Sequence, residues 1–463
     1  MIRLSLLLTL AVLATPAVAR DLTPAETARI DAVVADALAK SGAPSASIAV
    51  VRDGRIVLAK AYGKASETIP AARPDLPYQV ASISKQFTAA ALQLLENDGK
   101  LSLDDRVAKY LPDISGAETI TLRQLLDHTS GLQDYWPQDY SFAAMATPTT
   151  PQGIVDRWAG KPLDFAPGSQ WQYSNTGYVV AGMIVEKVSG QPLLSFLDAR
   201  VFKPLGMASV IDQDKAIGPR FPQGYQRFAL GPVRVEPPAA DGWLYAAGEL
   251  SMTASDLARW NIARLDRALL PADDWTAQET ATRLTDGKDT GYGLGVSIGS
   301  LDGRRVIEHS GASVGFLSQN LVFPAERAAV TVLTNASFSN AYRVMAQMIA
   351  RAILPASANA DTAWAAKARI IFDQLRSGTL DTSLLTSNAA YYFTPTARAD
   401  YKASLSAIGE PTGFTAVGQP RPRGGFVGRS YRVSYGDRAL AISVFTEPGD
   451  DGRFEQFLVQ PIQ

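Results

Sequence analysis

The chain of 463 residues contains no cysteine and only two histidines, His128 and His309. Without cysteine it has no disulfide cross-links, no thiol nucleophile and no lipid anchor on an N-terminal cysteine. A zinc site built from the usual cysteine and histidine ligands is not expected either, because so few of these ligands exist. We therefore expect neither a metal ion nor an organic cofactor.

An excess of charge of one sign is also lacking, because 44 Lys and Arg residues stand against 45 Asp and Glu residues. No basic stripe or cluster stands out along the chain, so nucleic acid is not an expected partner. Apolar residues make up 46% and charged residues 19%, which is typical of an ordinary globular protein. The length allows two or three domains with substantial cores.

Long apolar runs are absent except near the N-terminus, where Leu4 to Leu13 follows the single basic residue Arg3. The small residues Ala17-Val18-Ala19 complete the pattern of a secretory signal peptide, with cleavage expected after Ala19. The run is too short to span a membrane comfortably, although an uncleaved anchor is the alternative. We therefore expect a secreted or periplasmic protein without a stable membrane span after cleavage.

Hydrophobic periodicity predicts an α/β (α+β) fold for residues 20–353. A helix is expected over Ala25 to Lys40, followed by two alternating runs that Asp53-Gly54 should join as a hairpin. Short helices and turns fill about residues 101–270, and then strand character returns before a helix at about residues 341–352. We expect an antiparallel sheet flanked by the first and last helices, with a helical lobe beside it and the chemistry between lobe and sheet.

The last hundred residues are predicted to form a separate module. Residues 354–363 are small and polar with one proline, which is typical of a linker. Residues 364–463 contain two helical segments and three alternating segments around Gly and Asp turns, which predicts a small α+β module. No motif assigns a role to this module, and the sequence does not reveal the oligomeric state.

The stretch VASISKQF places Ser82 and Lys85 three residues apart at the start of a helix predicted over Ser82 to Asn97. Residues with this spacing share one helix face, so the hydroxyl and the amine would be neighbours. The helix dipole and the apolar surroundings lower the pKa of a lysine amine, and a neutral amine can accept the proton of a serine nucleophile. The alternative is that Ser82 only caps the helix.

Two other motifs are treated as coincidental. The pentapeptide Gly311-Ala312-Ser313-Val314-Gly315 matches the G-x-S-x-G nucleophile elbow, but no histidine follows it and a strand is predicted where the elbow requires a helix. The segment GYGLGV at residues 291–296 lacks the third glycine of a dinucleotide-binding motif. We interpret it as a glycine-rich strand.

Further motifs follow the S-x-x-K pair in order: YSN at residues 173–175 before an apolar helical run, and HSG at residues 309–311 at the end of a strand. With the segments LLDHTSGL, VFKPLGM, AAGELSMTASDLARW and GYGLGV, this order resembles the serine β-lactamase and penicillin-binding protein family. The branch that it resembles contains class C β-lactamases, D,D-carboxypeptidases, D-aminopeptidases and related esterases. The resemblance covers about residues 24–353 and implies a β-lactamase/transpeptidase-like fold.

The resemblance implies a role for each matching position. Ser82 would attack a carbonyl and form an acyl-enzyme, Lys85 would tune or accept its proton, and Tyr173 would pass a proton to the leaving group. The substrate-binding positions would be Asn175, His309, Ser310 and Gly311, with the backbone amides of Ser82 and Ala312 as the oxyanion hole. From the residues alone, a tyrosine such as Tyr173 is more often a packing residue, and Asn175 is equally a helix cap.

The two histidines receive different interpretations. His309 stands where lactamases of the family usually have a lysine, and a histidine is only partly charged near neutrality. Family members with histidine there include D,D-peptidases, D-aminopeptidases and esterases, so the resemblance favours these over a β-lactamase. His128, in LLDHTSGL, is expected to be structural.

The sequence therefore predicts an exported serine hydrolase that cleaves amide or ester bonds through an acyl-enzyme. The expected substrates are small molecules or peptides with D-amino acid character. A carboxylesterase of the same fold is the first alternative and a β-lactamase the second. Outside enzymes, the alternatives are a β-lactam sensor that acylates once and an inactive scaffold, but every polar motif position carries a chemically competent residue.

Overall fold

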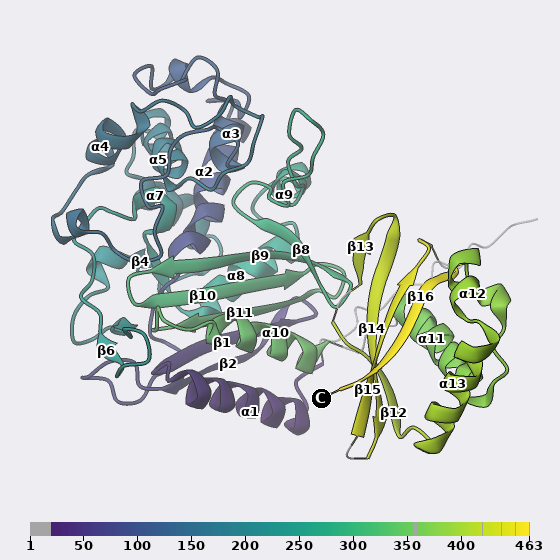
Figure 1. Cartoon of the computed structure of the whole chain (residues 1–463). Coiled ribbons are helices and arrows are strands. Elements are labelled where there is room, and N and C mark those ends of the chain that lie inside the picture. The colour runs from purple at the N-terminus through teal and green to yellow at the C-terminus, as the bar shows by residue number, and fades with distance from the viewer. Residues whose placement is uncertain (1–19, 355–359, 419, 437, 450, 463) are drawn as a thin grey trace, which may run out of the picture. The chain divides into compact units, whose positions relative to one another are not determined.

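The computed structural model describes residues 20–354, 360–418, 420–436, 438–449 and 451–462 (Figure 1). The predicted signal peptide, residues 1–19, lies outside the described residues, so export stays a prediction. None of the described helices is long and apolar enough to cross a membrane. The chain divides into two units, Met1–Leu301 with Arg305–Pro355, and Asp302–Arg304 with Ala356–Gln463.

The larger unit is built on a six-stranded sheet of order β2-β1-β11-β10-β9-β8. Its strands are β1 (Ser45–Arg52), β2 (Arg55–Gly63), β8 (Ser297–Leu301), β9 (Arg304–Ser313), β10 (Phe316–Phe323) and β11 (Ala328–Thr334). The predicted hairpin is confirmed, since β1 and β2 pair antiparallel across Asp53-Gly54, both with positive φ. β1 also pairs antiparallel with β11, with Ala46 opposite Thr334, so the sheet is completed late in the chain.

Helices cover both faces of this sheet. α1 (Pro24–Ser41) and α10 (Ala341–Ile353) contact each other and share one core with alternate strand residues such as Ile48. α8 (Ala254–Leu265) contacts β1, β2 and β11 and shares the other core, to which Ala49 belongs. Because successive strand residues point to opposite faces, β1 serves both cores. The predicted flanking by the first and last helices of this unit is confirmed.

The helical lobe lies beside the sheet, as Figure 1 shows. Its helices are α2 (Lys85–Asn97), α3 (Leu122–Leu126), α4 (Pro151–Ile154), α5 (Asn175–Ser189), α6 (Leu193–Leu197), α7 (Tyr245–Gly248) and α9 (Ala272–Gln278). Short strands β3 (Tyr78–Gln79), β7 (Leu250–Met252) and β4 (Ile211–Asp212) form a small sheet of their own, and β5 (Tyr225–Gln226) pairs with β6 (Arg234–Val235).

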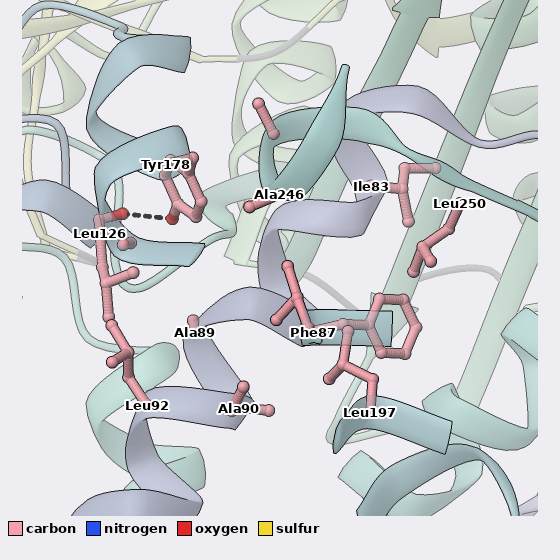
Figure 2. Packing of buried hydrophobic residues seen from close by; sticks show 14 of the residues in the cluster. Ile83, Phe87, Ala89, Ala90, Leu92, Leu126, Tyr178, Leu197, Ala246 and Leu250 are labelled. Carbon is pink, nitrogen blue, oxygen red and sulfur yellow. Dashed lines mark hydrogen bonds between the residues drawn. The ribbon is translucent and has the colours of Figure 1, made fainter. Parts of the chain in front are cut away.

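α2 is the central helix of the lobe, and its residues from Lys85 to Leu95 are all buried. Figure 2 shows Phe87 and its neighbours on α2 packed among side chains from other helices, including Tyr178 and Ala246. The Tyr178 hydroxyl donates a hydrogen bond of 2.5 Å to the Leu126 carbonyl, which ties α5 to the end of α3. This packing fixes the position of the first turn of α2, where Lys85 lies.

The smaller unit has its own core. It contains α11 (Ala360–Ser377), α12 (Ser387–Tyr392) and α13 (Pro395–Ala407), and the strands β12 (Gly413–Ala416), β13 (Arg421–Arg423), β14 (Phe426–Tyr435), β15 (Arg438–Thr446) and β16 (Phe454–Pro461). The sheet order is β12-β14-β15-β16, with β13 on β14. Trp364, Phe372 and Ile442 belong to one apolar cluster between helices and sheet. α11 begins inside the predicted linker, 354–363, of which residues 355–359 lie outside the described residues.

Candidate active site

Ser82 lies in a short 3-10 helix, Ala81–Ser84, between β3 and the first residue of α2. The predicted α-helix therefore begins three residues later than expected, at Lys85. The N-cap positions of the 3-10 helix and of α2 are Val80 and Ser84, so Ser82 caps neither helix. Ala81 has φ +49°, a conformation that costs a non-glycine residue about 1–3 kcal/mol. This tight turn leaves the Ser82 side chain partly exposed among buried neighbours.

The Lys85 amine contacts three oxygen atoms. Its Nζ lies 3.1 Å from Ser82 Oγ, 2.7 Å from Asn175 Oδ1 and 2.7 Å from the Ala247 carbonyl oxygen. The side chain is completely buried. Burial lowers the pKa of Lys85 from 10.5 to about 7, while the negative charge of Asp134 acts in the opposite direction.

These contacts direct the amine toward Ser82. The Ala247 carbonyl can only accept hydrogen bonds, and Asn175 Oδ1 is likewise an acceptor, because the Asn175 amide nitrogen donates to the Asp134 carboxylate. A neutral amine has two N–H groups and one lone pair, so these two acceptors take both N–H groups. The lone pair then faces the Ser82 hydroxyl at 3.1 Å and can accept its proton.

Asp134 is a site residue that the sequence analysis missed. Its carboxylate accepts hydrogen bonds from the Asn175 backbone N–H at 3.0 Å and from the Asn175 amide at 3.2 Å. Burial raises its pKa above the ordinary aspartate value, against hydrogen bonds from Trp136 and Asn175 and the charge of Lys85. Asn175 is not a helix cap, since the side chain of Ser174 takes that place on α5. An acidic residue in the apolar stretch GLQDYW was the available signal.

Tyr173 is both packed and directed at the nucleophile. Its ring lies 4.2 Å from the His128 ring, and Lys85 Nζ is 4.9 Å from its centroid. Burial raises the pKa of Tyr173 above 10, although a hydrogen bond with Ser82 lowers it in part. The phenol is therefore protonated in the resting site and can donate a proton.

His309 lies on β9 and is buried. Its Nδ1 is 2.6 Å from the Ser310 carbonyl oxygen, which can only accept, so Nδ1 carries the proton. Its Nε2 is 2.8 Å from the Tyr292 hydroxyl and therefore accepts. Burial and then the charge of Lys85 lower the pKa of His309 from 6.5 to about 4, so the imidazole is neutral at physiological pH rather than partly charged as expected.

Tyr292, the partner of His309, was also missed, although it belongs to the GYGLGV segment. The prediction that residues 291–296 form a strand is wrong, because β8 begins only at Ser297. Gly291 and Gly295 have positive φ, and a Cβ on Gly293 would lie 1.9 Å from the Gln278 carbonyl oxygen. The glycines serve close packing and turns, which a strand does not need.

Gly311 allows β9 to lie directly against the turn that carries Ser82. A Cβ at this position would be 2.1 Å from the Val80 carbonyl oxygen and 2.3 Å from Ser318 Oγ. The next residue, Ala312, is exposed beside this contact. Ser313 is instead buried and donates to Gln79 Oε1 at 2.8 Å, and β10 follows where an elbow would need a helix. The interpretation of G-x-S-x-G as coincidental is thus confirmed.

His128 supports the site without reaching the nucleophile. Its Nδ1 accepts a hydrogen bond of 3.1 Å from the Ser174 backbone N–H, and its ring packs among Tyr173, Tyr178 and Tyr292. Burial lowers its pKa well below 6.5. A structural role is what the sequence predicted. Among the residues that the structure describes, no group of three or more His, Cys, Asp or Glu could hold a metal ion.

A serine whose hydroxyl faces the lone pair of a buried lysine defines a site of the lysine-activated serine hydrolase type. A family model described as Beta-lactamase matches residues 30–354, which is more than half of the chain. The chain therefore belongs to the Beta-lactamase family, and its fold is that of this family of serine hydrolases. The predicted family and fold class are confirmed.

Relatives and solved structures agree with this assignment. Penicillin-binding protein 4* of Bacillus subtilis is 29% identical over 289 residues, which cover 59% of this chain and 64% of that protein. The match thus spans less than two thirds of that relative. The structure of a D-stereospecific amidohydrolase from Streptomyces sp. is 29% identical with TM-score 0.60, covering 70% of this chain and 97% of that chain.

One solved structure also reaches into the smaller unit. The octameric penicillin-binding protein homologue from Pyrococcus abyssi covers 94% of this chain and 99% of its own, with TM-score 0.62 and 21% identity. At this identity the likeness concerns the fold alone. It indicates that the α+β module after residue 356 is not peculiar to this chain.

Proposed function

We propose that the chain is an exported serine hydrolase that cleaves amide or ester bonds, with a preference for acyl groups of D-amino acid character. The observation that carries the proposal is the distance of 3.1 Å between the buried Lys85 Nζ and Ser82 Oγ. The similarity to a D-stereospecific amidohydrolase supports the substrate class. The signal-peptide pattern of residues 1–19 supports export.

The geometry supports a two-step mechanism. Ser82 Oγ attacks the carbonyl carbon as its proton passes to Lys85 Nζ, and the backbone amides of Ser82 and Ala312 hold the developing oxyanion. Tyr173 donates its phenol proton to the leaving group and regains a proton from Lys85. Water then attacks the acyl-enzyme, its proton returns through the same groups, and Ser82 is released. Asn175 and the strand edge at Ser310 and Gly311 position the substrate.

The state of His309 supports a preference within the family. A neutral imidazole whose two nitrogens are engaged by Ser310 and Tyr292 offers no permanent cation to a substrate carboxylate. A lysine has an ordinary pKa of about 10.4 against about 6.5 for histidine, so it takes up a charge much more readily at neutral pH. We therefore propose amides and esters without an obligatory carboxylate as substrates, ahead of carboxypeptidase and β-lactamase substrates. An esterase for small acyl groups is the second candidate, because uncharged esters fit the same description.

Substrate comparison tests this preference. We expect D-alanine p-nitroanilide to be hydrolysed with a kcat/KM about tenfold or more above that of its L-isomer and of a peptide ending in D-alanyl-D-alanine. p-Nitrophenyl acetate, assayed in parallel, measures esterase activity. Rapid turnover of esters alone would favour the esterase, and a preference for the D-alanyl-D-alanine peptide would contradict the interpretation of His309.

The charge of Asp134 should be visible in the pH profile. Lys85 must be neutral to accept the proton of Ser82, so kcat/KM should rise with pH through an acid limb near 7. Asp134 raises the pKa of Lys85, so Asp134→Asn should move this limb to lower pH by about one unit. Asp139→Asn, at an exposed position in the same loop, is the control and should leave it in place. A limb that moves upward, or does not move, would contradict the coupling.

A further inference from the structure

The smaller unit contains a groove that the hydrolase site does not use. A cavity of about 420 Å³ lies between α12 and β16, lined by Asn388, Tyr391, Tyr392, Glu455, Gln456 and Leu458 among others. Its volume is in the range of small-molecule binding sites. We refer to it as the tyrosine groove.

Two consecutive tyrosines present their rings to solvent at this groove. Tyr391 is 85% exposed and Tyr392 50% exposed, whereas the next residue, Phe393, is buried. Exposed aromatic rings that line a cavity offer a flat apolar surface to a ligand. The Tyr392 ring is held in place, because it packs edge-on against Phe393 at 5.1 Å and its hydroxyl hydrogen-bonds with Tyr401. The Tyr392 ring is therefore fixed at the wall of the groove, and the Tyr391 ring beside it offers the exposed aromatic surface.

Polar groups of fixed orientation lie beside the rings. Glu455 accepts hydrogen bonds of 2.6 Å from the Thr386 hydroxyl and of 2.6 Å from the Asn388 amide. The pairing of β15 with β16 shifts register at Glu455, between the partners of Phe445 and Thr446. Such a bulge redirects a side chain, here toward α12. A carboxylate has about four acceptor sites, so these two bonds leave further acceptor capacity.

This combination matches the chemistry of a sugar. A pyranose ring has a face of C–H groups, which stacks on the electron-rich face of a tyrosine, and a rim of hydroxyl donors, which a carboxylate or an amide oxygen can accept. The lining residues that the structure describes include no lysine or arginine, so an anionic ligand would find no counter-charge.

A peptide strand is the competing occupant, because β16 is the last strand in the sheet order. Its edge is already engaged at one end: Leu385 forms a parallel bridge with Phe454, and the Thr386 N–H donates to the Phe454 carbonyl. Backbone pairing would also make no use of the exposed Tyr391 ring. The aromatic and acceptor groups therefore favour a glycan over a strand.

We propose that the tyrosine groove binds a neutral glycan chain, with a pyranose ring stacked on the exposed Tyr391 ring and its hydroxyls donating to Glu455 and Asn388. Glycan binding itself is independent of the hydrolase site. Its consequence, that the groove holds the enzyme at glycan-linked peptides carrying D-amino acids, rests on the proposed function.

Binding is tested with the full chain and an N-acetylglucosamine tetrasaccharide, by isothermal titration and by saturation-transfer NMR. We expect Tyr391→Ala to weaken binding about tenfold, the equivalent of about 1.4 kcal/mol, and Tyr391→Phe to retain it because the ring face remains. Tyr140→Ala, which removes a tyrosine 70% exposed in the larger unit, is the matched control and should have no effect.

The outcomes separate the two proposals. Turnover of soluble D-alanine p-nitroanilide is measured on the same samples and should be unchanged in Tyr391→Ala, so loss of hydrolysis and loss of glycan binding are scored independently. No binding by wild type, or binding that Tyr391→Ala and Tyr140→Ala affect equally, would overturn the glycan site. Binding of an extended peptide that the tetrasaccharide does not compete for would overturn it in favour of strand addition.

Discussion

Replacing Ser82 by alanine should abolish turnover of every substrate that the wild-type chain accepts. The substitution removes the only atom that can form the acyl bond in the proposed mechanism, together with the proton donor to Lys85. The loss should be about 10,000-fold or more in kcat, because a nucleophile and its base act as one unit. The fold should persist, since Ser82 caps no helix and its side chain is partly exposed.

Ser313 provides the matched control for this experiment. It is the serine of the coincidental G-x-S-x-G match, and its hydroxyl donates to Gln79. Ser313→Ala should cost about 1 kcal/mol of stability through the lost hydrogen bond while keeping most of the activity. The assay is steady-state hydrolysis of D-alanine p-nitroanilide and p-nitrophenyl acetate, with thermal melts to verify folding. Normal rates in Ser82→Ala, or a dead Ser313→Ala enzyme that is folded, would refute the assignment.

Replacing Lys85 by methionine should be the second most damaging change. The two side chains have similar length, but methionine has no lone pair that can take the Ser82 proton, so kcat/KM should fall about 1,000-fold or more. The remaining activity should also lose the acid limb near pH 7, because the group that titrates there is gone. Asn175 Oδ1 and the Ala247 carbonyl lose their donor, which should lower stability by about 1–3 kcal/mol for each unsatisfied acceptor.

Lys187 offers a control lysine in the same lobe. It lies on α5 and donates to the Tyr110 carbonyl at 2.6 Å. Lys187→Met should therefore lower the melting temperature without changing the acid limb or the chemical step. If Lys85→Met keeps near wild-type kcat/KM, or keeps an acid limb at the same pH, Lys85 is not the base.

The parts of the fold that follow from local patterns could be predicted from the sequence. The alternating runs on either side of Asp53-Gly54 and the periodic helix before them specify the hairpin and α1. The start of α2 was misplaced by three residues, because Ala81–Ser84 forms a 3-10 helix in place of a first α-helical turn. The GYGLGV segment was misread as a strand because its glycines are needed for close contacts with residues distant in the sequence, and such contacts cannot be read from the segment itself.

The candidate site could likewise be predicted only in part. Ser82 and Lys85 are close because they are three residues apart in the sequence. That Tyr173 of YSN and His309 of HSG belong to the same site was predicted from the resemblance to a family. Asp134, Tyr292 and the Ala247 carbonyl were not predicted. Asp134 and Tyr292 come from irregular segments whose position depends on tertiary packing. Ala247 lies on α7, and its backbone carbonyl has no sequence signal at all. The neutrality of His309 likewise depends on its burial and on the charge of Lys85 nearby.

The central claim is that Ser82 Oγ forms a covalent acyl-enzyme. It is tested most directly by reacting wild type and Ser82→Ala with p-nitrophenyl acetate and quenching in acid during turnover, followed by intact mass measurement and peptide mapping. The account predicts one adduct, located on Ser82 and absent from the variant. An adduct on another residue, or equal labelling of the variant, would contradict it.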